Sequence, residues 1–253
     1  MEKIDAVVLA AGRLSAGSTN RAKQEYKGFV RVGETTPLEA MLAALRQTAP
    51  VAEIIVVGPL ALRSSVTGFD RWLPEKKAGE DNVVAGLREA QTPRVLLCAS
   101  DIPFVRAQDV AGFLDLATPD CAVAFPIFER TEFLAHFPGG RDKFARLGPE
   151  EWTGGSLCIV DRAVVLRNEA LMRHAFQARR SQLAMASLLG PSVLLKHLSG
   201  GLRVEDVIGR VSRLLGAKAA AVRGSSPRLA MDCDSAEDIE YARALAARGG
   251  PVA

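Results

Sequence analysis

The chain has 253 residues, of which 48% are hydrophobic and 24% are charged, and its formal net charge is +3. This composition is typical of a globular chain that buries a sizeable core without disulfides or a structural metal. The mild, scattered positive charge does not indicate binding to nucleic acid. No apolar run approaches the roughly 18 residues that a membrane span requires.

The cysteines and the N-terminus predict a soluble, cytoplasmic protein. The four cysteines lie far apart, each in or beside an apolar run, and none has the Cys/His spacing of a zinc site. We expect them to be reduced core thiols. The first residues, MEKIDAVVLAAGR, include acids and too short an apolar run for a signal peptide. The cysteines are Cys98, Cys121, Cys158 and Cys233.

The first half of the chain alternates unbroken apolar runs with amphipathic segments. Unbroken apolar strands separated by helices indicate a parallel sheet that is covered on both faces. Thr36, Pro37 and Glu39 form a helix start signal, with Thr36 as the N-cap. In chain order we expect a strand at 4–9, a helix at 36–49, a strand at 53–58, a helix at 82–90, a strand at 94–100, a helix at 107–117, and a strand at 121–128 that Pro126 interrupts.

The second half is less regular, but it returns to the same sheet. Ser235, with Asp238 three residues later, predicts the start of a last helix that Gly249 ends. The whole chain is predicted to form one α/β domain, a three-layer α/β/α fold with a mostly parallel, Rossmann-like sheet. The remaining expected elements are an excursion with a Gly-Gly turn at 128–151, a strand at 152–161, helical segments at 162–190 and 203–216, strands at 219–224 and 228–234, and a helix at 235–249.

A long basic loop follows the first strand in VVLAAGRLSAGSTNRAKQEYKGF, residues 7–29. Ligands of parallel sheets bind at the carboxyl ends of strands, where this loop begins. Gly12 and Gly17 permit close backbone approach to phosphate oxygens, although neither the GxxxxGK[ST] nor the GxGxxG pattern is present. Two interpretations stay open, a phosphate-binding loop and a solvated surface loop. The cations of the loop are Arg13, Arg21, Lys23 and Lys27.

Aspartates follow two further apolar runs. Asp101 comes directly after the run VLLCAS, where a carboxylate can hold Mg²⁺ or cap the next turn. Asp232 and Asp234 flank Cys233, so their side chains would share one face of a strand end. The alternative is that Asp234 and Ser235 only start the last helix.

Together, these motifs resemble those of the MobA-like nucleotidyltransferases, the NTP-transferase branch of the GT-A-type fold. The resemblance spans nearly the whole chain, and its motifs occur in the family's order. Here the loop from Gly12 to Lys27 is longer than the family's usual loop. The matching stretches are LAAGR at Leu9–Arg13, Lys27, Pro37-Leu38, DIPF from Asp101, TGG at Thr153–Gly155, and DCDSAEDI from Asp232 to Ile239.

The resemblance implies Mg²⁺-dependent transfer of a nucleotidyl group from an NTP to a small phosphorylated acceptor, a sugar phosphate or cofactor phosphate, with release of pyrophosphate. It implies an NTP-binding half at 1–125, an acceptor-facing insertion at 126–216, and closing strands and a helix at 217–253. Expected partners are the NTP and the acceptor, with no nucleic acid and no membrane.

The implied catalytic residues are Arg13, Lys27 and Asp101. The implied metal ligands are Asp101 and Asp234. The implied nucleotide-binding residues are Leu9, Ala10, Ala11, Gly12, Arg13, Arg21, Lys27, Asn82, Gly86 and Asp101. The implied acceptor-binding residues are Arg141, Lys143, Thr153, Gly154 and Gly155.

Two other functions stay open at this point. The sequence DCD at 232–234 satisfies the DxD pattern of nucleotide-sugar glycosyltransferases on related folds. A nucleotide-binding regulatory protein without catalysis would retain the same loop and scaffold. For Arg141 and Lys143, solvent exposure alone is the alternative to a role in binding the acceptor.

Overall fold

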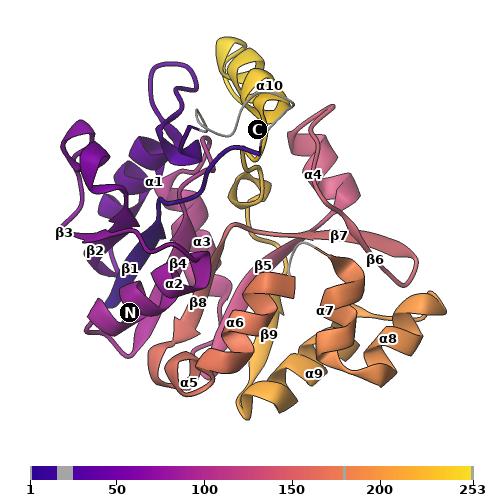
Figure 1. Cartoon of the computed structure of the whole chain (residues 1–253). Helices are drawn as coiled ribbons and strands as arrows, with labels where there is room; N and C mark the ends of the chain where they lie inside the picture. Colours follow the sequence, from indigo (N-terminus) through magenta and orange to yellow (C-terminus); the bar gives the residue numbers. More distant parts are fainter. Residues whose placement is uncertain (1, 16–24, 179–180, 252–253) are drawn as a thin grey trace.

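The computed structural model describes residues 2–15, 25–178 and 181–251. Within these ranges a central sheet is covered by helices on both faces (Figure 1). Gly17, Arg21 and Lys23 of the basic loop lie outside the described residues. The strands are β1 (Ile4–Leu9), β2 (Val51–Gly58), β3 (Arg71–Pro74), β4 (Arg94–Ala99), β5 (Val123–Glu129), β6 (Ala145–Leu147), β7 (Glu150–Gly154), β8 (Leu157–Asp161) and β9 (Ala219–Val222).

The sheet has the strand order β3-β2-β1-β4-β8-β5-β7-β6, with β9 paired to β5. β1 is parallel to β2 and β4, β2 is parallel to β3, and β5 is parallel to β9. β8 is antiparallel to both β4 and β5, and β7 is antiparallel to β5 and β6. The predicted α/β fold is therefore confirmed, and antiparallel pairings join its two halves at β8.

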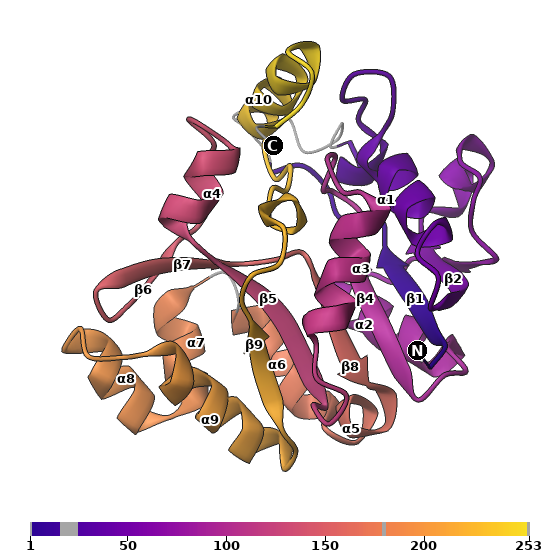
Figure 2. The same cartoon turned by 180° about the vertical axis from the view of Figure 1, so that it is seen from behind.

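Alternate residues of the central strands supply two separate cores. Val8 and Leu96 face one core with α1 (Pro37–Arg46), α3 (Ala107–Leu116) and α10 (Ala236–Ala247). Val7 and Val95 face the other core with α2 (Gly79–Glu89), α5 (Arg162–Arg167) and α6 (Glu169–Ala178). Figure 1 shows α6 in front of the sheet, and Figure 2 shows α3 in front when the molecule is turned. This arrangement confirms the three predicted layers.

The remaining α-helices lie beside the second half of the sheet (Figure 2). α7, α8 and α9 enclose a small core of their own around Leu189 and Val193. None of the helices in the described ranges is long and apolar enough to span a membrane. These α-helices are α4 (Arg130–His136), α7 (Gln182–Leu189), α8 (Pro191–Leu198) and α9 (Val204–Leu215). The short 3₁₀ helices are η2 (Lys27–Phe29), which packs against α1, η3 (Leu60–Ser65), which packs against β3, and η4 (Pro227–Leu229).

Two helix starts form as their sequences predict. At the start of α1 the Thr36 Oγ1 accepts the Glu39 N–H, and the Thr36 N–H donates to the Glu39 carboxylate. At the start of α10 the Ser235 and Asp238 side chains form the same reciprocal pair. Both are capping boxes, which satisfy backbone donors that a helix start leaves without partners.

Three local predictions are wrong. Residues 228–234 form no strand: η4 is followed by an extended segment whose Cys233 N–H donates to the carbonyl of Asp101 at 3.0 Å. The stretch 152–161 is divided between β7 and β8, because the chain leaves one strand pairing at Gly155 and enters another. Pro126 does not interrupt β5, where it is opposite Val222. The sequence prediction also missed β3 and α8, as well as α4 and β6 within the expected excursion at 128–151. Its division of the chain into functional parts stays a prediction.

Candidate active site

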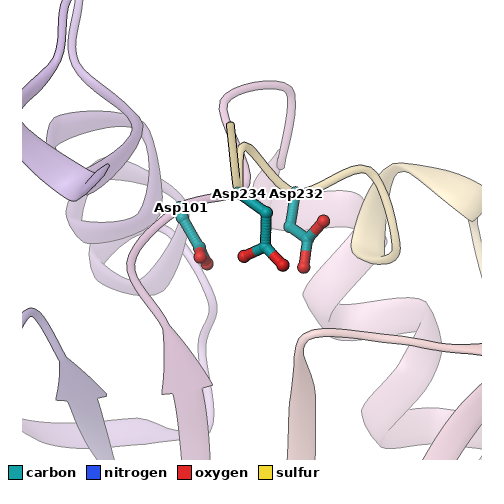
Figure 3. A group of neighbouring side chains, drawn as sticks. All are labelled: Asp101, Asp232 and Asp234. Atoms are coloured by element: carbon teal, nitrogen blue, oxygen red, sulfur yellow. The ribbon is translucent and has the colours of Figure 1, made fainter. Parts of the chain in front are cut away.

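Three carboxylates meet at the carboxyl end of β4. Asp101 lies two residues beyond the end of β4, while Asp232 and Asp234 come from the segment between η4 and α10. One oxygen of each carboxylate lies within 4.8 Å of the others, and Figure 3 shows the three side chains pointing into one space. The structure thus brings together the two predicted metal ligands, Asp101 and Asp234, and adds Asp232. We call these three residues the carboxylate cluster.

Lys27 reaches the carboxylate cluster from the far end of the basic loop. Its Nζ lies 3.3 Å from the Asp101 carboxylate and also forms an ion pair with Asp234. Gly28 makes this approach possible, because a Cβ there would lie 2.7 Å from Ser100 Oγ. The Lys27 N–H donates to the carbonyl of Gly12 at 2.9 Å, which joins the two ends of the loop.

The electrostatics of the cluster reflect three acids in a partly buried space. Burial, together with the charges of Asp101, Asp234 and Asp142, raises the pKa of Asp232 to about 8. Burial also raises the pKa of Asp101 despite the opposing effect of Lys27. Burial alone would lower the pKa of Lys27, but the charges of Asp101 and Asp234 leave this pKa above its usual value. Ionising all three carboxylates is therefore unfavourable unless a second cation joins Lys27 at the cluster.

The cluster fits a divalent metal ion. The Asp101 Oδ1 is buried and has no hydrogen-bond partner among the described residues, although a buried carboxylate oxygen ordinarily has one. Carboxylate oxygens are the ligands that Mg²⁺ prefers in proteins. Asp101, Asp232 and Asp234 are the residues that would hold such an ion.

A fourth acid, Asp142, lies beside the cluster, and the sequence prediction missed it. The Thr153 hydroxyl donates to its Oδ2 at 2.8 Å, and burial raises its pKa. The neighbouring Lys143 is exposed, but its Nζ lies 3.2 Å from the Asp234 carboxylate. Two predicted acceptor-side residues, Lys143 and Thr153, therefore lie at the edge of the cluster. The sequence did contain an indication of this acid, because Asp142 lies between Arg141 and Lys143, the two predicted cations.

The other predicted acceptor residues are arranged differently. Gly155 is required by close packing, because a Cβ there would lie 2.6 Å from Pro126 Cγ and 3.2 Å from the Leu229 carbonyl oxygen. Gly154 and Arg141 are exposed. A role for these three residues in binding the acceptor stays a prediction.

The first part of the basic loop crosses from β1 to the cluster. Ala10 is buried and its N–H donates to the carbonyl of Val57 at 2.8 Å, whereas Leu9 and Ala11 are half-buried and Gly12 is exposed. Further along, both the N–H and the hydroxyl of Ser15 donate to the carbonyl of Asp234. The loop is therefore attached to the segment that carries two of the acids.

Arg13 is held by a residue from the other end of the loop. Its guanidinium lies 3.9 Å from the centre of the Tyr26 ring and donates to the Tyr26 hydroxyl at 2.5 Å. The Tyr26 hydroxyl in turn donates to Glu75, which directly follows β3. The sequence prediction missed Tyr26 and Glu75, because 49 residues separate them and no short motif joins them.

Asn82 and Gly86, two of the predicted nucleotide-binding residues, lie in α2. Asn82 is buried, and its Oδ1 accepts the Lys76 N–H at 2.6 Å, which fixes the turn before the helix. Gly86 packs against β1, since a Cβ there would overlap Val7 Cγ1. Packing accounts for the glycine, and contacts of either residue with the nucleotide stay a prediction.

Comparison with protein families gives this geometry a context. The model of the MobA-like NTP transferase domain matches residues 6–193. The chain therefore belongs to the MobA-like NTP transferase family, and it is a nucleotidyltransferase. This result favours nucleotidyl transfer over the glycosyltransferase and the non-catalytic protein that the sequence left open. No curated protein sequence matches the chain.

Solved structures agree with the family. A hypothetical transferase from Thermus thermophilus is 31% identical, with a TM-score of 0.79, over 94% of this chain and 99% of that one. The 2-C-methyl-D-erythritol 4-phosphate cytidylyltransferase from the same species is 22% identical, with a TM-score of 0.57, over 98% and 100% of the two chains. A CMP:2-keto-3-deoxy-manno-octonic acid synthetase complexed with CTP is 15% identical, with a TM-score of 0.59, over 98% and 100%. The last two comparisons show a shared fold.

Proposed function

We propose that this nucleotidyltransferase uses Mg²⁺ to transfer a nucleotidyl group from an NTP to a small phosphorylated acceptor, a sugar phosphate or cofactor phosphate, and releases pyrophosphate. The observation that carries the proposal is the carboxylate cluster with Lys27 at the carboxyl end of β4. Ligands of open α/β sheets bind at this edge. Dispersed cysteines support the cytoplasm as the location.

The reaction needs no general base, because a phosphate acceptor is already ionised at neutral pH. An acceptor oxygen attacks the α-phosphorus of the NTP in line, a new P–O bond forms, and the α–β P–O bond breaks. Pyrophosphate leaves with the electron pair of that bond. Catalysis then depends on holding the reactants in position and on neutralising their charge.

A Mg²⁺ ion held by Asp101 and Asp234, with Asp232 beside them, would neutralise phosphate charge and orient the oxygens. Lys27 forms ion pairs with the same two carboxylates. A cation held there would compete for these carboxylates, and the Lys27 ammonium would then be available to the triphosphate. Arg13 and the backbone N–H groups of 11–13 would contact the phosphates, and Arg21 keeps its proposed role in the same loop. Lys143 and Thr153 would lie on the acceptor side.

The test is pyrophosphate release from ATP, GTP, CTP, UTP and dTTP, each mixed with a panel of sugar phosphates and cofactor phosphates. We expect one pair of substrates to release pyrophosphate in the presence of Mg²⁺, and Asp101→Asn to abolish the release. The proposal would be contradicted if Asp101→Asn released pyrophosphate at the wild-type rate. Turnover of UDP-glucose without any NTP would support the glycosyltransferase instead.

A further inference from the structure

Arg13, Tyr26 and Glu75 form a chain of contacts between two loops at the carboxyl edge of the sheet. The Tyr26 hydroxyl accepts from the Arg13 Nη2 at 2.5 Å and donates to the Glu75 Oε1. The same guanidinium lies over the Tyr26 ring, 3.9 Å from its centre. We call these three residues the Arg13 relay.

The direction of the hydrogen bonds in the Arg13 relay is fixed by chemistry. An ionised carboxylate only accepts and a guanidinium only donates, so the single hydroxyl proton must point to Glu75. Burial and the hydrogen bond to Glu75 raise the pKa of Tyr26, which keeps the hydroxyl protonated at neutral pH. Both hydrogen bonds involve a charged partner, which makes them stronger than bonds between neutral groups.

The backbone holds Arg13 and Tyr26 opposite each other. The two residues form an antiparallel bridge, and the Leu14 N–H donates to the Glu25 carbonyl at 3.0 Å. An arginine side chain loses much rotational freedom when it is held in one orientation. The ring face and the hydroxyl of Tyr26 together restrict the guanidinium to one side of the loop.

Glu75 connects the Arg13 relay to the start of α2. Its own N–H donates to the carbonyl of Gly58 at 2.9 Å, and the N–H of the next residue, Lys76, is bound by the buried Asn82. Glu75 is thus fixed both to the end of β2 and to α2. A carboxylate held in this way gives the Tyr26 hydroxyl a stationary acceptor.

We propose that Tyr26 and Glu75 are positioning residues, which orient Arg13 toward the triphosphate and connect the basic loop to the segment before α2. The inference rests on the proposed function, since it takes Arg13 as a ligand of the triphosphate. Tyr26 and Glu75 act through Arg13 and need not touch the nucleotide.

The probe is inorganic triphosphate with Mg²⁺, which tests phosphate binding independently of the base, and its dissociation constant is measured by calorimetry. Tyr26→Phe keeps the ring and removes only the hydroxyl, and we expect the dissociation constant to rise about tenfold. Glu75→Ala should have a similar effect. Glu75→Gln retains an acceptor without the charge, so its effect should be smaller.

The matched control is Tyr241→Phe at the chain's other tyrosine, whose hydroxyl donates to the Pro138 carbonyl at 3.2 Å. Triphosphate binding by this control should equal that of the wild type.

A double-mutant cycle separates positioning from a general effect on the fold. If Tyr26 acts through Arg13, Tyr26→Phe should cause no further loss of affinity in an Arg13→Gln background. The inference would be overturned if the losses of triphosphate affinity in the two single variants added up in the double variant. It would also be overturned if Tyr26→Phe bound triphosphate as tightly as the wild type while Arg13→Gln bound it weakly. If Arg13→Gln binds like the wild type, the inference fails while the proposed function survives. If the wild type binds neither triphosphate nor any of the five NTPs, the proposed function itself fails.

Discussion

Gly28 shows how a single residue without a side chain determines the geometry of the site. A Cβ at this position would lie 2.7 Å from Ser100 Oγ and 2.9 Å from Ser100 Cβ, closer than packed atoms allow. The backbone of η2 can therefore lie against the end of β4 only with glycine here. Lys27, one residue earlier, reaches Asp101 and Asp234 from this position.

We expect Gly28→Ala to displace Lys27 and to lower kcat/KM for the NTP by about tenfold or more, since small misplacements of charged groups are costly in catalysis. The matched control is Gly112→Ala in α3, where no neighbouring atom of the described residues lies within 4 Å of an added Cβ. That change should stabilise the protein by about 0.5–1 kcal/mol and leave turnover unchanged. Steady-state kinetics and urea unfolding check both variants, and wild-type kcat/KM in Gly28→Ala would contradict the role of this close approach.

Among the secondary-structure elements, α10 determines where Asp234 lies. The Asp238 carboxylate accepts the N–H of Asp234 at 3.1 Å and that of Ser235 at 2.9 Å, so the capping box also fixes the backbone of the carboxylate cluster. The equivalent box at α1, formed by Thr36 and Glu39, caps its helix without such a contact to the cluster. The two boxes therefore allow a controlled comparison, because each caps a helix and the box at α10 also holds the backbone of the cluster.

Removing either box should cost about 1 kcal/mol of the free energy of unfolding, because each change leaves helix donors without partners. Glu39→Ala should retain the wild-type affinity for Mg²⁺ and NTP, whereas Asp238→Ala should weaken it several-fold. Urea unfolding and calorimetry measure the two effects separately. Equal affinities in the two variants would show that α10 does not position Asp234.

On the scale of the whole molecule, the parts predictable from sequence are those with local signals. The apolar strands β1 and β4, the capped helices α1 and α10, and Asp101 at a strand end all depend on neighbouring residues. Asp232 and Asp234 lie in the site although the strand expected at 228–234 does not form, because hydrogen bonds with distant segments hold their backbone. Asp142 is held beside the cluster by its hydrogen bond with Thr153, and no local pattern predicts that contact.

Acid stability of the whole fold depends on similar long-range contacts. Burial alone would raise the pKa of Asp70, but hydrogen bonds from Arg46 and from the Ile54 N–H lower it below its usual 3.8. A lowered pKa stabilises the fold above pH 3.8, and this stabilisation is lost as the pH falls through the lowered value. Asp70→Asn should therefore be less stable than the wild type at neutral pH, with the difference vanishing in stronger acid. Urea unfolding between pH 2 and pH 7 measures the difference in free energy of unfolding between the two proteins. A difference that did not change with pH would contradict the role of the Asp70 carboxylate.

The most direct test of the carboxylate cluster is the thermal stability of wild-type protein and Asp101→Ala with ATP, GTP, CTP, UTP and dTTP, each with and without Mg²⁺. A ligand that binds the native state raises the melting temperature. We predict that at least one triphosphate stabilises the wild type only with Mg²⁺, and that the melting temperature of Asp101→Ala does not rise under any of these conditions. Equal Mg²⁺-dependent stabilisation of both proteins would contradict the assignment of Asp101 as a metal ligand.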